Sequence, residues 1–381
     1  MIKKLFNSNL LKLNAMNSIE GFGWSLIGIF IPIYLLSLGY SLKQVFIYFI
    51  IQNTSIMLSS FFVVIIGKKI SLKKILIFRF PFLLLFLILL YNLKTINFPI
   101  NLLAIIDGFQ LAFFWLPMHI LFSQFANKND IGSSTGKLFA IPKFVTMFCP
   151  LIGGLIAINF GFKILFITAT TFFLAGLIPI LYAKISPLNY DFKIEDGLTL
   201  YKKYKKYFYS EICNNIGEEI EGVIWPIFVY INLINIASIG LIGTLLAVSS
   251  AIFTLVVGRI ADKTDKMKMI KASVIFISIV WILRFIFNNE LAFYILTIIS
   301  GIVFVVFSIP YYSIFYQIAQ KEKAPIFFAF REIPVNIARV IVFSFGIVLA
   351  TNLKIFFIIA ALAYIYFLFW NKSKTNGLIK I

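Results

Sequence analysis

The chain has 381 residues, of which 61% are hydrophobic and 13% are charged, and its mean hydropathy is +0.98. Soluble domains carry about 25% charged residues, so this composition excludes a soluble globular fold and predicts an all-α protein embedded in a lipid bilayer. The net charge of +19 would also fit nucleic-acid binding, but the positions of the charges argue against that partner.

Apolar stretches of about 20 residues, the length needed to cross a bilayer, recur along the chain and predict about twelve transmembrane helices. The expected spans are 13–37, 43–66, 75–93, 98–122, 136–159, 162–183, 209–232, 236–257, 270–288, 291–318, 327–350 and 354–371. The longest polar segment lies between the sixth and seventh spans. It predicts an N-terminal six-helix bundle over 1–184, a cytoplasmic linker over 185–207, and a C-terminal six-helix bundle over 208–381.

The basic residues are sorted by loop. Of the 34 Lys and Arg, 25 lie in the two termini and in alternate loops, four lie in the intervening loops, and five lie within the spans. Because cytoplasmic loops carry the excess of basic residues, this pattern predicts a multi-pass protein of the cell membrane with both termini in the cytoplasm.

The two halves share a sequence pattern. Segments 107–126 and 300–319 align at an offset of 193 residues, and shorter matches recur in chain order at offsets of 191 to 194. The pairs include Gly108 with Gly301, Pro117 with Pro310, Pro32 with Pro226, Gly23 with Gly217 and Gly67 with Gly258. The constant offset predicts a parallel duplication of a six-helix unit, which would give two pseudo-symmetric bundles.

A dense run of charges, GRIADKTDKMK over 258–268, interrupts the apolar sequence between the eighth and ninth spans. It resembles the glycine–aspartate–basic loop signature of the major facilitator superfamily. The matching positions are Gly258, Asp262, Lys263, Asp265 and Lys266. The resemblance implies the major facilitator fold, with twelve helices in two halves.

The resemblance also implies a conformational latch on the cytoplasmic side. Asp262 would cap the start of the fifth span near Ser133, Ser134 and Gly136, where unpaired N–H groups favour an anion. In the first copy of the signature, over 67–74, Gly67 is present but Ser71 replaces the aspartate. The predicted latch residues are Gly67, Gly258, Asp262, Lys263 and Lys266; alternatively, these charges only keep the loop in water.

The fifth span has a second resemblance. It contains Gly136 and the run Pro150-x-x-Gly153-Gly154, which is similar to the helix-five signature of drug–proton antiporters, although Val145 and Cys149 replace two of its glycines. This resemblance favours export. Small residues and Pro are also common in membrane helices in general.

Ionisable residues inside a bilayer cost at least about 2.5–3.5 kcal/mol each, so they are candidates for function. We expect substrate binding or proton coupling from Glu20, Asp107, Lys143, Glu218, Glu221, Arg331, Glu332 and Arg339, with Gln52 and Asn53 as polar neighbours. Glu219 and His119 lie in the same spans. In the family the first, fourth, seventh and tenth helices line the cavity.

Glu218 and Glu221 are three residues apart and would share one helical face. Two carboxylates this close repel, which favours a proton on one of them. A static ion-pair network, such as Asp107 with Arg339 or Lys143 with a glutamate, is the alternative. Arg79 and Arg284 lie near the ends of their spans and are expected to extend towards the interface.

Together, these features predict a secondary active transporter that moves a small solute by alternating access. Proton coupling and efflux of amphipathic compounds are favoured, and the family implies a monomer. A lipid flippase, a scramblase or a membrane sensor of the same fold is the alternative. The single His, the two unpatterned Cys and the lack of a nucleophile motif argue against an enzyme, a metal site or a cofactor.

Overall fold

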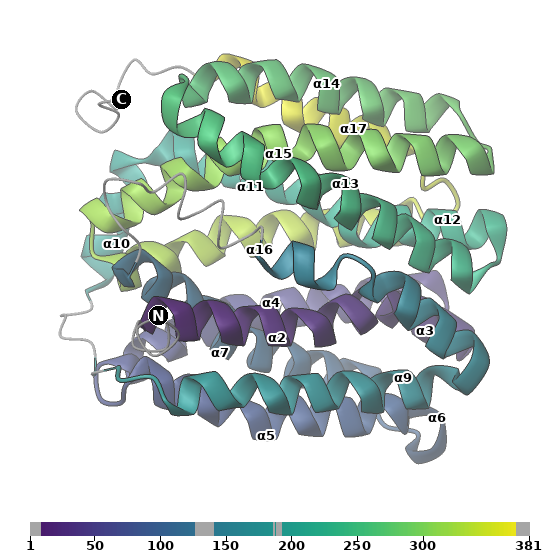
Figure 1. Ribbon diagram of the computed structural model, residues 1–381, viewed down its shortest axis with the longest axis horizontal. Helices are drawn as coiled ribbons and strands as arrows, with labels where there is room; N and C mark the ends of the chain where they lie inside the picture. Colours follow the sequence, from purple (N-terminus) through teal and green to yellow (C-terminus); the bar gives the residue numbers. More distant parts are fainter. Residues whose placement is uncertain (1–8, 126–140, 186, 188–192, 371–381) are drawn as a thin grey trace.

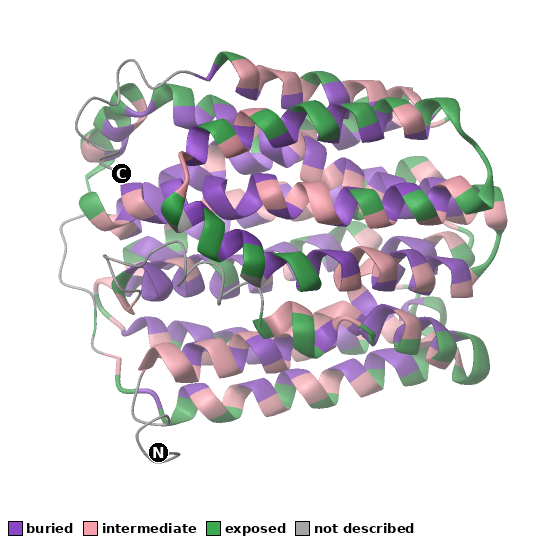
Figure 2. Ribbon diagram, turned by 45° about the horizontal axis from the view of Figure 1, so that its top comes forward, coloured by how far each residue is buried: buried purple, intermediate pink, exposed green. Residues whose placement is uncertain are grey.

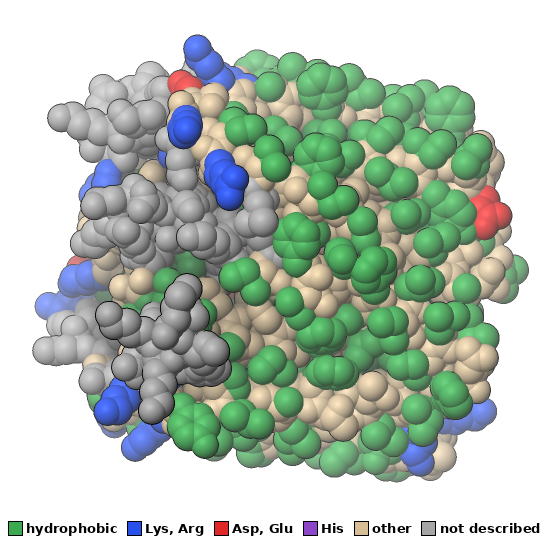
Figure 3. Space-filling view, viewed as in Figure 1, with side chains coloured by type: hydrophobic (Ala, Val, Ile, Leu, Met, Phe, Trp, Pro, Cys, Tyr) green, Lys and Arg blue, Asp and Glu red, His purple; other side chains and the backbone are tan. Residues whose placement is uncertain are grey.

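The computed structural model describes residues 9–125, 141–185, 187 and 193–370. Across these residues all regular structure is helical, and the helices run side by side along the long axis of the molecule (Figure 1). Their inward faces are buried and their outward faces are exposed (Figure 2). Hydrophobic side chains cover the broad face of the molecule between its two ends, as expected for a surface that contacts lipid (Figure 3).

The first half begins with a broken helix. Its parts are α2 (Asn9–Ile27), the 3₁₀ turn η1 (Gly28–Phe30) and α3 (Ile31–Ser37). It is followed by α4 (Leu42–Gly67), α5 (Leu72–Tyr91), the short α6 (Leu93–Ile96) and α7 (Ile100–Phe125). Residues 141–146 are helical and lead into α9 (Cys149–Leu181). Gly161 has a φ of 82° inside α9, which breaks it into two membrane crossings.

The second half follows α10 (Ile194–Lys203), whose two faces differ strongly in polarity. Its first crossing is α11 (Lys205–Glu219), the π-helical turn η2 (Ile220–Ile224) and α12 (Trp225–Leu233). The others are α13 (Ile236–Lys263), α14 (Lys266–Ile286), α15 (Glu290–Lys321), α16 (Ala324–Val348), and α17 (Ile355–Ile365) with the 3₁₀ turn η3 (Tyr366–Phe369).

Among the described residues, eight helices are long and apolar enough to cross a membrane by length and composition alone. One of them, 141–181, holds two crossings because of the break at Gly161. The α11–α12 and α16 crossings fall outside this set because they carry several charged side chains, and the α17 crossing because it is short. The expected all-α membrane fold, with about twelve helices in two halves, is confirmed.

The internal repeat is visible in the way the helices break and pack. Pro32 and Pro226, 194 residues apart, are each the second residue of the helix that follows an irregular turn. A Cβ added to Gly108 would lie 2.2 Å from the backbone oxygen of Gln52, and one added to Gly301 would lie 2.8 Å from that of Leu246. Each glycine thus lets the fourth helix of its half approach the second, with partners that are again 194 residues apart.

The two halves meet along two pairs of helices. The α4 helix packs against α16, where the rings of Phe49 and Phe343 stack with centroids 4.9 Å apart. The α9 helix packs against α13, where the backbone N–H of Leu151 donates to Thr244 Oγ1 over 3.0 Å. The start of α2, the end of η3 and all of α10 lie at the same end of the molecule (Figure 1).

Candidate functional site

A cavity of about 390 Å³ lies between the two halves. The first half contributes wall residues from α2, from residues 141–146 and from α9; the second half contributes wall residues from α11, η2, α12, α13 and α15. Most of the wall is apolar, and its charged side chains among the described residues are Lys143, Glu218 and Glu221. These three are among the residues expected at the site, and the fold brings them to one cavity.

A second cavity of about 310 Å³ adjoins the first. It lies between α2, α7, residues 141–146 and α15, and its wall is rich in aromatic rings. Four residues line both cavities: Trp24, Ser25, Lys143 and Thr146. We call the first the charged cavity and the second the aromatic cavity. Lys143 therefore lies on the wall that they share.

The π-helical turn η2 shapes the charged cavity. Such turns often mark functional sites because they widen the helix by one residue. Glu221 and Gly222 of this turn both line the cavity, as does Glu218 one turn earlier. A Cβ added to Gly222 would meet no atom within 4 Å, so the backbone is open to the cavity here. Glu219 instead pairs with Arg339, at 2.9 Å between Oε1 and Nε.

Glu221 forms a two-pronged ion pair with Arg284 of α14, at 2.6 and 3.0 Å. Ser300 also donates to Glu221 over 2.9 Å. The Arg284 guanidinium lies 4.1 Å from the ring centroid of Trp225, and the side chain is fully buried. The expectation that Arg284 extends to the interface is wrong, because a buried carboxylate and an aromatic face hold its charge inside the protein.

Arg79 is also buried, so the same expectation is wrong for this residue. Its Nη1 lies 2.6 Å from Glu20 Oε2, and neither side chain is exposed. Its Nε donates to Gln110 over 3.0 Å, and its guanidinium lies 4.3 Å from the ring centroid of Phe114. Glu20 therefore lies in the core of the first half, and it is not a residue of either cavity wall.

Asp107 is fully buried and is held by neutral donors. Tyr48 and Gln52 each donate to its Oδ2 over 2.5 Å, and Gln110 donates to its Oδ1 over 2.8 Å. Gln110 thereby links Asp107 to Arg79. The alternative of a pair between Asp107 and Arg339 is wrong, because Arg339 instead contacts Glu219 and Asn215 of α11. Asn53 points back along its own helix and donates to the oxygen of Phe49.

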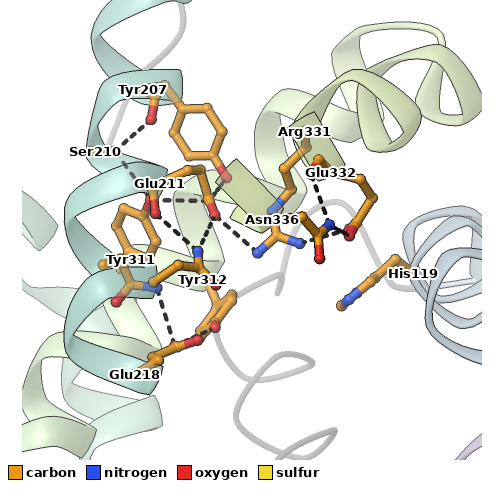
Figure 4. Close-up of polar contacts among 12 residues, drawn as sticks. His119, Tyr207, Ser210, Glu211, Glu218, Tyr311, Tyr312, Arg331, Glu332 and Asn336 are labelled. Atoms are coloured by element: carbon orange, nitrogen blue, oxygen red, sulfur yellow. Dashed lines mark hydrogen bonds and ion pairs between the residues drawn. The ribbon is translucent and has the colours of Figure 1, made fainter. Parts of the chain in front are cut away.

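A polar network joins α11, α15 and α16 in the second half (Figure 4). Arg331 pairs with Glu211 over 3.0 Å and approaches Glu332 at 3.5 Å. Tyr207 donates to Glu211, and Tyr311 donates to the same carboxylate over 3.0 Å. Asn336 donates to Glu332 over 3.0 Å.

Sequence reasoning missed Glu211, the centre of this network. It lies near the start of the expected span 209–232, where the sequence is still polar. Its spacing from Tyr207 and Asn215, four residues on either side, was the available signal, because side chains at this spacing meet on one helical face. Asn215 donates to Glu211 over 3.3 Å.

Glu218 differs from Glu211, Glu219 and Glu221 of the same crossing, each of which pairs with an arginine. Asn214 donates to it over 3.1 Å and Tyr312 over 2.7 Å. Within the described ranges it has no ion pair, and neither has Lys143, which faces the same cavity. The alternative of an ion pair between Lys143 and a glutamate is therefore not found among these residues.

His119 joins the halves beside the aromatic cavity. Its Nδ1 lies 2.9 Å from the hydroxyl oxygen of Tyr316, which belongs to α15. The imidazole stacks on Phe328 of α16, with ring centroids 5.5 Å apart. In the part of the chain that the structure describes, no group of three His, Cys, Asp or Glu is placed to hold a metal ion.

The expected latch lies partly outside the described residues. Gly67 ends α4, Gly258 and Lys263 belong to the last turns of α13, and Lys266 begins α14. The side chain of Asp262 is not described, and its expected partners Ser133, Ser134 and Gly136 lie in the undescribed range 126–140. The latch stays a prediction.

The second aspartate of the loop, Asp265, and Ser71 in the first half each cap a helix. Asp265 accepts from the backbone N–H of Met267 over 2.9 Å and caps α14, while Ser71 accepts from that of Lys74 over 3.4 Å and caps α5. By its place as a helix cap, Ser71 is thus the counterpart of Asp265, 194 residues away, and not of Asp262 as the sequence pattern indicated.

Comparisons with known proteins agree with this architecture. The family model of the Major Facilitator Superfamily matches residues 13–206 and again residues 207–379. No curated protein sequence matches the chain. A bacterial homologue of the iron transporter ferroportin has a similar structure, with a TM-score of 0.72 at 12% identity. The similarity covers 95% of this chain and 99% of that chain.

Two further solved structures are similar in fold. The E. coli fucose:proton symporter FucP has a TM-score of 0.69 at 13% identity, over 94% of this chain and 97% of its own. The human organic anion transporter MFSD10 (TETRAN) has a TM-score of 0.70 at 9% identity, over 94% of this chain and 98% of its own. With the family model covering nearly every residue, the chain belongs to the Major Facilitator Superfamily of membrane transporters.

Proposed function

We propose that the chain is a secondary active transporter that exports a small amphipathic solute across the cell membrane in exchange for protons. The charged cavity carries this proposal, because both halves supply its wall and its lining combines apolar surface with Lys143, Glu218 and Glu221. If the halves rock against each other, such a cavity opens to each side of the membrane in turn. Its volume of about 390 Å³ is in the range of small-molecule sites.

Glu218 and Asp107 are the best-supported proton-coupling residues. Neutral donors hold both carboxylates, so either can gain a proton without leaving a buried cation unpaired. Glu20 and Glu221 are less suitable, because protonation of either would free the charge of Arg79 or Arg284. Arg331, Glu332 and Arg339 lie in ion pairs and serve first to join α16 to α11.

Sequence patterns support the proposed direction of transport and the proposed orientation in the membrane. The described end that holds α10 is rich in lysine, which supports a cytoplasmic location for both termini. The Pro-x-x-Gly-Gly run that resembles antiporters lies where the halves meet. A Cβ at Gly153 would lie 2.4 Å from the oxygen of Leu26, and one at Gly154 would lie 3.4 Å from that of Ile236. This close packing of three helices supports a role for the run in the motion of the halves.

Flux through proteoliposomes tests the proposal. Purified protein would be reconstituted and offered a panel of radiolabelled organic cations, anions, zwitterions and amphipathic drugs, with and without a pH gradient. We expect uphill movement of at least one solute only when the gradient is present. Glu218→Gln and Asp107→Asn should each abolish gradient-driven accumulation. Glu290→Gln, at the exposed start of α15, is the matched control and should leave it unchanged.

Two outcomes would contradict the proposal. Accumulation that is unchanged in both variants would remove the two carboxylates from the coupling mechanism. A flat solute panel together with movement of fluorescent phospholipid between leaflets would instead favour a lipid flippase or scramblase. The mass of the detergent-free particle, measured by light scattering in nanodiscs, tests the expectation of a monomer.

A further inference from the structure

The two adjoining cavities differ in chemistry and meet at one basic side chain. The charged cavity contains the carboxylates, whereas the aromatic cavity is lined by Phe114, Trp115 and Tyr316. Lys143 belongs to the wall of both. A solute that fills both cavities would therefore place a charged group near Lys143 and an apolar or aromatic body beside it.

Opposite charges face the charged cavity from opposite halves. Lys143 comes from the first half and Glu218 from the second, and in the described ranges they do not lie within ion-pair distance of each other or of another charged group. Glu221, the third charged residue, is neutralised by Arg284. The cavity thus presents one cation and one anion from opposite halves, neither of which forms an ion pair among the described residues. Both side chains are half-buried at the cavity wall, so a solute with charges of both signs could add a charge-assisted hydrogen bond to each of them.

We propose that the transported solute is a zwitterion with an aromatic body, in the manner of an aromatic amino acid. Its carboxylate pairs with Lys143, its ammonium group pairs with Glu218, and its ring occupies the aromatic cavity. The inference rests on the proposed transport function and names its substrate class. An anion alone would pair only with Lys143, and a cation alone would pair only with Glu218.

Such a solute would also connect the two halves. Its two charges would bind one residue of each half, so its binding would favour the conformation in which Lys143 and Glu218 lie closest together. Differential affinity of this kind is what a solute needs to shift a conformational equilibrium. A singly charged analogue would hold only one half.

Four indole compounds of similar shape test the charge requirement. They are the free amino acid tryptophan, tryptamine, indole-3-propionate and indole, which are respectively zwitterionic, cationic, anionic and neutral. Binding to the purified full chain would be measured by titration calorimetry at pH 7. We expect tryptophan to bind at least about tenfold more tightly than either singly charged compound, because each lost charge removes one charge-assisted contact.

Two charge variants assign the contacts. Lys143→Gln should weaken tryptophan and indole-3-propionate by about tenfold and leave tryptamine unchanged. Glu218→Gln should weaken tryptophan and tryptamine by a similar factor and leave indole-3-propionate unchanged. A uniform loss for all compounds in either variant would contradict a direct contact.

Two glycine-to-leucine variants test whether the solute binds in the charged cavity. Gly222→Leu would project into the charged cavity without a clash and should weaken tryptophan strongly. Gly28→Leu is the matched control, since a Cβ at Gly28 also meets no atom within 4 Å and Gly28 lines neither cavity. It should leave binding unchanged, whereas equal loss in both variants would contradict this location.

The failure of this inference can be told apart from failure of transport itself. Preference for tryptamine or for indole-3-propionate over tryptophan, or no binding of any of the four, overturns the zwitterion proposal. If another solute of the flux panel still moves against its gradient in proteoliposomes, the transporter proposal survives that result. If no solute moves, the transporter proposal fails as well.

Discussion

Each half of the molecule buries one glutamate–arginine pair between its first and third helices, but the two pairs have different surroundings. Glu20 and Arg79 are fully buried in the core of the first half. Glu221 is 18% exposed on the wall of the charged cavity and binds Arg284 through both oxygens. The comparison separates a pair that holds a bundle together from a pair that also shapes a binding surface.

The largest effect is expected from Arg79→Met. The change leaves Glu20 buried without its cation, so the free energy of unfolding should fall by about 3–5 kcal/mol. Thermal and denaturant unfolding in detergent would measure it. The double variant Glu20→Leu with Arg79→Met is the control and should recover much of the loss. A single variant as stable as the wild-type chain would show that the pair contributes nothing to the core.

A smaller loss is expected from Arg284→Met, about 1.5–3 kcal/mol, because the remaining Glu221 carboxylate can be hydrated from the cavity. The same unfolding measurement applies. A loss equal to that of Arg79→Met would contradict the contrast between the two pairs. Solute binding should be weakened more by Arg284→Met than by Arg79→Met, since only Arg284 positions a residue of the cavity wall.

Gly108 and Gly301, which occupy equivalent positions in the two halves, allow the helix packing of the halves to be compared. Gly108→Ala should cost about 1–3 kcal/mol, because its Cβ would meet the rigid backbone oxygen of Gln52 at 2.2 Å. Gly301→Ala should cost less, since its nearest obstacle is the Ser249 hydroxyl, a side chain that can rotate away. Unfolding of both variants in detergent checks the order, and the reverse order would contradict the packing described for the two halves.

The smallest effects are expected at the helix caps. Asp265→Ala should cost about 1 kcal/mol and Ser71→Ala about 0.5 kcal/mol, since Asp265 lies closer to the N–H that it accepts from. Asp265→Asn keeps an acceptor and is the control. A larger loss for Ser71→Ala, measured by thermal unfolding, would contradict the assignment of the stronger cap to the second half.

Sequence patterns predicted the fold well because the bilayer leaves few alternatives. Span length, loop charge and the repeat offset each limit the architecture on their own. Charged residues within the spans were also found readily, since they stand out in apolar sequence, and Lys143, Glu218 and Glu221 do share a cavity.

The pairing of those charges was harder to predict, because it depends on which helices are neighbours and on how far a long side chain reaches. Arg79 and Arg284 were assigned to the interface from their distance to the ends of the spans. In the fold, their side chains reach across to Glu20 and Glu221. Glu211 was missed because the first turns of its helix are polar, although Arg331 and two tyrosines enclose it.

The proline that restarts the first helix of each half gives a common reference for the heights of the two ion pairs. Glu20 lies 12 residues before Pro32, whereas Glu221 lies five residues before Pro226, its counterpart. Seven residues of helix correspond to about 10 Å of height. Arg79 lies eight residues after the cap Ser71, and Arg284 lies 19 after the cap Asp265. The two ion pairs therefore lie at different heights, so the repeat does not superimpose one on the other, although each joins the first and third helices of its half.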